Sequence, residues 1–143
     1  MAHAHKTVTS PKPPAEVFAY LADFSTTAEW DPGISAARRL YEGPLGVGNR
    51  VELDAGFFGR TITLIYETTL YEAPHRFIVR GESSTIVSVD EITVEADGTG
   101  SLVTYDAELT LKGALKIFDP ALGLGFGKVA DKAIAGLRTA LSA

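Results

Sequence analysis

The sequence predicts an α+β fold in which a strongly curved, seven-stranded antiparallel sheet is covered by a long C-terminal helix. Between residues 34 and 112, apolar and polar residues alternate in segments separated by turn residues, which is typical of antiparallel strands with one buried face. From about residue 120 the apolar residues recur at helical spacing instead. The 143 residues have the usual length of one domain, so we expect a single domain over residues 1–143.

The N-terminal segment predicts one strand followed by two short helices. Residues 3–9 suit a strand that ends at the proline-rich turn SPKPP. Pro14 fits the first turn of a helix that continues to residue 24, because a residue at this position needs no backbone N–H donor. A second short helix is expected to begin with Ser25 as its N-cap and to end at Pro32. Both helices therefore lie between the first and second strands.

Six further strands are expected after the helices. The turn clusters GPLGVGN and DGTG separate some of them, and DGTG is a hairpin signal. Successive side chains of a strand point to opposite faces, so one set of alternate residues should face the helix. The expected strands are 34–43, 50–59, 60–72, 75–82, 85–96 and 101–112. The expected inward residues include Leu53, Phe57, Ile62, Leu64, Tyr66, Ile92 and Tyr105.

The glycine-rich segment GLGLGFGKVADKAIAGL, residues 123–139, predicts an amphipathic helix entered near Pro120. A phosphate-binding Walker loop does not fit, because Leu122 stands in place of its first glycine and Val129 in place of Ser or Thr. The glycines at residues 123–127 allow close packing or a frayed first turn, or they leave room for a cavity beside the sheet. The apolar stripe of this helix is Leu122, Phe126, Val129, Ala130, Ala133, Leu137 and Leu141.

Composition and charge argue against several classes of function. The formal net charge of −5 disfavours a general affinity for nucleic acid or anionic membranes. The chain has no cysteine, no secretory signal and no apolar run as long as a membrane span, so we expect a cytoplasmic protein without membrane insertion. We expect a monomer or homodimer that uses no cofactor. His3 and His5 share one strand face but lack an identifiable third ligand, so we expect no metal site.

Four motifs resemble the START/birch-pollen-allergen-related (SRPBCC) superfamily, in particular its polyketide cyclase/dehydrase-like branch. They are PAEVFAYLADFSTTAEWDPGI (14–34), GVGNRV (46–51), YEAPHRF (71–77) and GTGSLVTYDAEL (98–109), and the similarity covers essentially the whole chain. The resemblance implies the helix-grip fold, in which the sheet wraps around the C-terminal helix. It implies a carrier or sensor that binds a small hydrophobic ligand, such as a lipid or a polyketide or aromatic compound, between sheet and helix. The alternatives are a polyketide cyclase/dehydrase-type enzyme with general acid/base groups in the same cavity, and an interaction module.

Asp90 is the main candidate for acid/base chemistry. If Ile92 faces inward, period-two alternation also places Asp90 inward, where a carboxyl group must be paired or protonated. A one-residue bulge would instead turn Glu91 inward or leave Asp90 at the solvent-exposed end of the strand. Arg80 on the preceding strand is a candidate partner for Asp90, although the residues FIVR allow either register.

Aromatic residues complete the expected site. Tyr66 and Tyr105 either fill the core or hold a carbonyl or hydroxyl group of a ligand, and Trp30 either caps the core or stacks on the ligand. Phe57 and Phe58 lie in a hairpin bounded by glycine, and we expect at least one of them to close the cavity entrance. The candidates for catalysis are Asp90, Tyr66 and Tyr105. The expected ligand-binding residues are Trp30, Leu53, Phe57, Ile62, Leu64, Tyr66, Asp90, Ile92, Tyr105, Leu122, Phe126, Val129 and Ala130.

Overall fold

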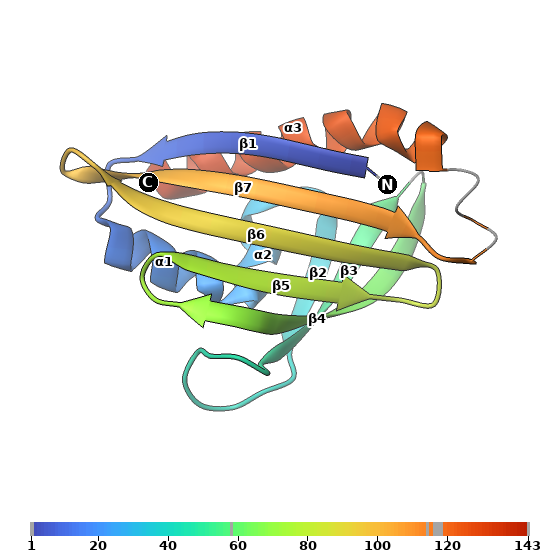
Figure 1. Cartoon of the computed structure of the whole chain (residues 1–143), viewed down its shortest axis with the longest axis horizontal. Helices are drawn as coiled ribbons and strands as arrows, with labels where there is room; N and C mark the ends of the chain where they lie inside the picture. The colour runs from blue at the N-terminus through green and yellow to red at the C-terminus, as the bar shows by residue number, and fades with distance from the viewer. Residues whose placement is uncertain (1, 58, 114, 116–118, 143) are drawn as a thin grey trace.

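A seven-stranded antiparallel sheet forms one layer of the structure, and the helices lie on one side of it (Figure 1). The computed structural model describes residues 2–57, 59–113, 115 and 119–142, without the side chains of residues 57 and 119–124. The sheet order is β1-β7-β6-β5-β4-β3-β2, which confirms the predicted seven-stranded curved sheet. The strands are β1 (Ala2–Ser10), β2 (Ile34–Arg39), β3 (Arg50–Phe57), β4 (Arg60–Glu72), β5 (Arg76–Glu82), β6 (Ile86–Asp97) and β7 (Gly100–Leu111).

The helical segments occupy the predicted places in the chain. Helix α1 (Pro14–Ala22), a single 3₁₀ turn η1 (Phe24–Thr26) and α2 (Thr27–Trp30) lie between β1 and β2, and α3 (Asp119–Ser142) ends the chain. Pro14 stands in the first turn of α1, as expected. The prediction that Ser25 is the N-cap of the second helix was wrong. The helical segment begins with η1, whose N-cap is Asp23, and the Asp23 carboxylate accepts a hydrogen bond from the Ser25 backbone N–H at 3.2 Å.

Strand alternation sets which side chains face the helices. In β6, alternate residues from Ile86 to Val94 are buried, and the pairing of β6 with β5 and β7 continues without a register shift. The bulge that would have turned Glu91 inward is therefore absent from this strand, and Glu91 accepts a hydrogen bond from Arg76 at 3.2 Å outside the core. Ile65, which interrupts the apolar pattern of β4, is 43% exposed on the outer face.

The predicted partnership between Arg80 and Asp90 is wrong. Strand β5 places Phe77, Val79 and Gly81 inward, so the intervening Arg80 faces solvent and donates to Glu82 at 2.9 Å. The register supports the same conclusion, because Arg80 lies opposite Val89 and Val79 lies opposite Asp90. Both registers of β5 were allowed by the sequence, and the phenylalanine and valine side chains determine which one is buried.

Helix α3 packs along β1 and against α2 (Figure 1). Its buried residues are Ile134, Leu137 and Leu141, whereas Lys128 and Lys132 are exposed, so the described part of the helix is amphipathic as predicted. The Ser10 hydroxyl donates a hydrogen bond to the Leu141 carbonyl at 2.7 Å, which ties the end of β1 to the end of α3.

The glycines of α3 differ in their surroundings. Gly127 is exposed and an added Cβ would meet no atom within 4 Å, so this glycine neither allows close packing nor opens a cavity. Close packing occurs instead at Gly136, where a Cβ would stand 1.8 Å from the Trp30 carbonyl oxygen. Gly123 lies in the part of α3 whose side chains are outside the description. In the described part of the chain, no helix is long and apolar enough to cross a bilayer.

Candidate functional site

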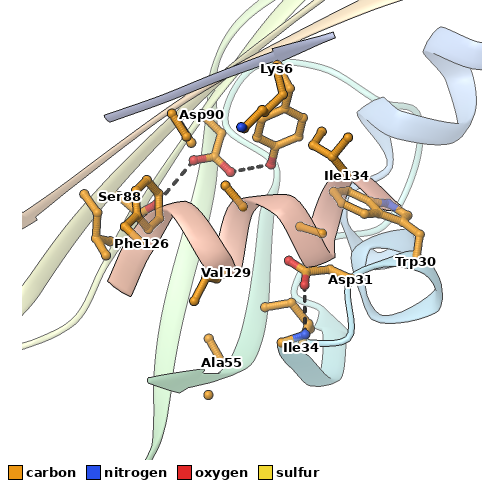
Figure 2. A pocket seen from close by; sticks show the side chains of 18 of the residues that line it. Lys6, Trp30, Asp31, Ile34, Ala55, Ser88, Asp90, Phe126, Val129 and Ile134 are labelled. Atoms are coloured by element: carbon orange, nitrogen blue, oxygen red, sulfur yellow. Dashed lines mark hydrogen bonds between the residues drawn. The ribbon is translucent and has the colours of Figure 1, made fainter. Parts of the chain in front are cut away.

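A cavity of about 90 Å³ lies between α3, the inner face of the sheet and the turn that follows α2 (Figure 2). This volume holds several water molecules or one small ring, and it is smaller than the roughly 300–1,000 Å³ of pockets for drug-sized molecules. Its wall is mostly apolar. The polar side chains on it come from Lys6 of β1, Asp31, Tyr66 of β4, Ser88 and Asp90 of β6, and Tyr105 of β7.

Asp90 faces this cavity, as the alternation of β6 predicts. Its side chain is buried, with the residue only 7% exposed. The Tyr105 hydroxyl donates to Asp90 Oδ2 at 2.5 Å, and the Ser88 hydroxyl donates to Asp90 Oδ1 at 3.3 Å (Figure 2). These two donors occupy one lone pair of each oxygen, so both oxygens can still accept a hydrogen bond from a ligand.

The electrostatics of the cavity follow from burial. Desolvation raises the pKa of Asp90 from 3.8 to about 6, and the charge of Asp31 acts in the same direction, whereas the hydrogen bonds from Tyr105 and Ser88 oppose the shift. Burial and the Asp90 charge raise the pKa of Tyr105 well above its usual range, so this phenol stays protonated and remains a donor. Asp90 therefore titrates close to neutral pH beside a neutral phenol.

Tyr66 reaches the cavity across a glycine. In the register of the sheet, Gly81 lies between Tyr66 on β4 and Ser88 on β6. A Cβ at Gly81 would stand 2.5 Å from the Tyr66 ring, so the ring lies directly over the glycine. Burial and the charge of Asp90 raise the pKa of Tyr66, and its phenol too remains protonated at neutral pH. Glycine at position 81 is thus required for the placement of this ring.

Asp31 is a second acid on the cavity wall, and the sequence reasoning did not identify it. Its carboxylate accepts a hydrogen bond from the Gly33 backbone N–H at 2.8 Å, which holds it in the turn after α2 (Figure 2). Burial raises its pKa, and the hydrogen bond from Gly33 opposes this. The sequence WDPG signals a turn with an aspartate that binds its own backbone, so the signal was present beside Trp30.

Lys6 is the basic residue on the described cavity wall, and the sequence analysis did not identify it either. It lies on the inner face of β1, directly opposite Tyr105 in the ladder. Its ammonium group forms an ion pair with Asp131 of α3 at 2.8 Å. The pattern of β1 carried the signal, because Lys6 occupies the face of Ala4 and Val8, both of which are buried.

The predicted site residues fall into three groups. Trp30 lines the cavity with its ring centroid 6.0 Å from that of Tyr105, and its Nε1 has no hydrogen-bond partner among the described residues. Phe58 and the side chains of Phe57 and Leu122 lie outside the description, so the entrance hypothesis is untested. The predicted residues that line the cavity are Trp30, Tyr66, Asp90, Tyr105, Phe126, Val129 and Ala130. Those that pack in the core away from it are Leu53, Leu64 and Ile92, with the half-buried Ile62 against them.

The two N-terminal histidines lie on the outer face of the sheet. Both are exposed, and both contact Asp106 of β7: His3 Nε2 at 3.2 Å and His5 Nδ1 at 2.8 Å. The sequence analysis did not identify the Asp106 carboxylate as a partner of the two histidines. Even so, the described residues contain no group of His, Cys, Asp and Glu side chains arranged to hold a metal ion.

The curved antiparallel sheet with a helix along its inner side is the START-like helix-grip fold. The structure resembles a START superfamily protein from Mycobacterium smegmatis at a TM-score of 0.80 and 13% identity, over 99% of this chain and 97% of that one. It also resembles a protein from Thermus thermophilus at a TM-score of 0.76 and 13% identity, over 96% and 94% of the two chains.

The third relative is the ZhuI aromatase/cyclase from Streptomyces sp. R1128, at a TM-score of 0.75 and 18% identity over 97% of this chain and 90% of that one. The chain belongs to the family described as polyketide cyclase / dehydrase and lipid transport, whose profile matches residues 1–142. No protein with a curated description matches the sequence. At these identities the structural likenesses establish the fold, and the family profile supplies the membership.

Proposed function

We propose that the chain binds a small hydrophobic molecule between the sheet and α3, as a carrier or sensor. The observation that carries this proposal is a hydrogen-bonded pair, the buried Asp90 and the half-buried Tyr105, on the wall of an otherwise mainly apolar cavity. Pockets for small ligands have this composition, in which apolar walls provide affinity and a few polar groups orient the ligand. The ligand accordingly has an apolar body and one polar group, which contacts Asp90.

The size of the cavity favours a ring over a long chain. A volume of about 90 Å³ suits a compact aromatic or polyketide-derived compound, and a lipid with a long acyl chain would require further opening. The aromatic side chains on the wall support the same choice, because Trp30, Tyr105 and Phe126 line the space. A compound with one small ring is therefore the preferred ligand class.

A second candidate function, acid/base catalysis, is favoured by the ionisation of Asp90. A carboxyl group with a pKa of about 6 can accept or donate a proton near neutral pH. Once Asp90 has taken up the proton from the carbon next to a carbonyl, the Tyr105 hydroxyl is no longer required by the carboxylate and can donate to the negative oxygen that forms. This chemistry corresponds to the cyclase and dehydrase activities in the family description.

The binding proposal is tested with the tryptophan that the cavity provides. Trp30 is the sole tryptophan of the chain and lines the cavity, so a bound ring should quench or shift its emission. Native mass spectrometry of the protein purified from its own host would show the mass of a co-purified molecule. We expect that molecule, once extracted and added back, to change Trp30 emission with saturation at one equivalent. A chain that carries no molecule, and whose emission no small aromatic compound alters, would refute the proposal.

The same molecule distinguishes the carrier from the enzyme. An enzyme converts it or its precursor to a chemically distinct product, with or without loss of water, and Asp90→Asn abolishes this conversion while binding persists. A carrier returns the molecule unchanged from wild type and variant alike.

A further inference from the structure

The charge on the cavity wall is unbalanced. Asp90 comes from the sheet and Asp31 from the turn after α2, so the two carboxyl groups approach the cavity from different walls (Figure 2). The described hydrogen bonds of these groups come from Tyr105, Ser88 and the Gly33 backbone, all of which are neutral donors. Neither carboxyl group has a described ion pair, although a buried carboxylate normally pairs with a cation.

The basic residue on the cavity wall, Lys6, does not neutralise these two acids. Lys6 is the single Lys, Arg or His among the described residues that line the cavity, and its ammonium group pairs with Asp131 of α3 at 2.8 Å. That pair is itself neutral, so among the described residues the cavity retains the charge of Asp31 and Asp90. A ligand with a negative group would add a further like charge to an enclosed space of low dielectric constant.

Aromatic rings on the same wall also favour a cation. Trp30 and Tyr105 pack edge to face with their centroids 6.0 Å apart, and Tyr66 and Phe126 line the cavity with them. Ring faces attract ammonium groups electrostatically, with tryptophan the strongest, and the attraction grows when the cation is removed from water. Carboxylates and aromatic rings together therefore form a site that suits an organic cation.

We propose that the ligand is an aromatic or alicyclic amine, whose protonated nitrogen binds at Asp90 and Asp31 while its ring packs against Trp30 and α3. This inference rests on the proposed function, because it specifies the polar group of the small hydrophobic ligand. The ammonium group donates hydrogen bonds to the free lone pairs of the two carboxylates. The ring replaces water beside Phe126, Val129 and Ile134.

Binding of an amine depends on the ionisation of the acids. The groups that face Asp90 are Ser88 on its own strand, Tyr105 on β7, Tyr66 on β4 and Asp31 after α2, with Lys6 on β1 held by Asp131 of α3. As the pH falls below about 6, Asp90 becomes protonated and its attraction for the amine is lost. A neutral ligand that accepts a hydrogen bond has the opposite dependence, because protonated Asp90 becomes a donor.

The experiment compares two probes of almost the same shape, benzylamine and benzyl alcohol, by Trp30 fluorescence and isothermal titration calorimetry at pH 7.5 and pH 5. At pH 7.5 we expect benzylamine to bind tighter by about tenfold or more, the usual effect of hydrogen bonds to a charged group. Asp90→Asn and Asp31→Asn should each reduce this preference severalfold, and pH 5 should reduce it in the wild type. Glu95→Gln, which changes an exposed acid of β6, should leave it intact.

The outcomes separate the two proposals. If benzyl alcohol binds as tightly as benzylamine, or if the preference survives in both aspartate variants, the amine inference is wrong while binding in the cavity stands. If neither probe changes Trp30 emission or releases heat, and the host protein carries no molecule, both proposals fail. Asp131→Asn gives a further check, since it frees the Lys6 ammonium group beside the cavity and should weaken benzylamine binding.

Discussion

The buried Asp90 carboxyl group lowers the stability of the fold and can also bind a ligand. Its carboxyl group is buried, and no cation among the described residues pairs with it, so the ionised form is disfavoured in the folded chain. A group of this kind is retained in proteins chiefly at sites where its altered protonation has a function. The same residue should therefore affect both the stability of the free protein and its binding of ligands, in opposite directions.

Because burial of the ionised Asp90 destabilises the folded chain, replacing it with a neutral residue should stabilise the protein. Between pH 3.8 and about 6 the folded chain holds a proton on Asp90 that the unfolded chain has released, so the stability contribution of this group falls as the pH rises through that window. Asp90→Asn keeps an acceptor for Tyr105 and removes the buried charge. At pH 7 we expect the variant to be more stable by about 1–3 kcal/mol in urea unfolding, with the gain lost near pH 4.

Glu95→Gln provides the control for this measurement, because Glu95 is exposed on the same strand. An Asp90→Asn variant that is less stable than wild type at pH 7 would show that the carboxylate is stabilised by an interaction beyond those described above.

Most residues of the site followed from strand or helix periodicity, whereas Lys6 on β1 and Asp31 in a turn were missed. Asp90 and Ser88 follow from the alternation of β6, because a side-chain period of two leaves a single choice once Ile92 is inward. Arg80 was assigned to the wrong face because FIVR has apolar residues in both registers. Asp31 lies in a turn, where no periodicity indicates which side chain faces a distant sheet.

At the scale of elements, α3 is positioned by contacts in its C-terminal half and near its middle. Its C-terminal half approaches α2 so closely that Gly136 lies against the Trp30 backbone, and Lys6 of β1 pairs with Asp131 nearer the middle. The amphipathic stripe predicted the helix and its buried face. It could not predict the backbone contact with α2, since this depends on the relative placement of elements about one hundred residues apart in the chain.

The glycines of α3 supply a matched pair of variants. A methyl group at Gly136 would collide with the Trp30 carbonyl, which cannot move without displacing α2, so Gly136→Ala should destabilise the fold by roughly 1–3 kcal/mol. Gly127 has open space around it on the exposed side of the same helix. Gly127→Ala should therefore stabilise by about 0.5–1 kcal/mol, the helix propensity gain alone.

Thermal or urea unfolding of both variants tests this packing. Equal effects of the two substitutions, in either direction, would contradict the close approach of α3 to α2.

At the scale of the whole molecule, the helices cover one face of the seven-stranded sheet. The predicted element order, seven-stranded antiparallel sheet and C-terminal helix are confirmed, because hydrophobic patterning determines which faces must be covered. The volume of the cavity was not predictable, because it depends on how far α3 stands from β6 and β7. The small residues Ala130 and Ala133 on the helix, and Ala107 on β7, line the space that remains.

The central claim is that a small molecule occupies the space between the sheet and α3. NMR spectroscopy of protein with labelled methyl groups, titrated in turn with benzylamine and benzyl alcohol, tests it most directly. The account predicts shifts in the methyl signals of Leu109, Val129 and Ile134, which line the cavity, with those of Ile65 and Val89 on the outer face unchanged. Shifts confined to the outer-face methyl groups, or no shifts with either compound, would contradict it.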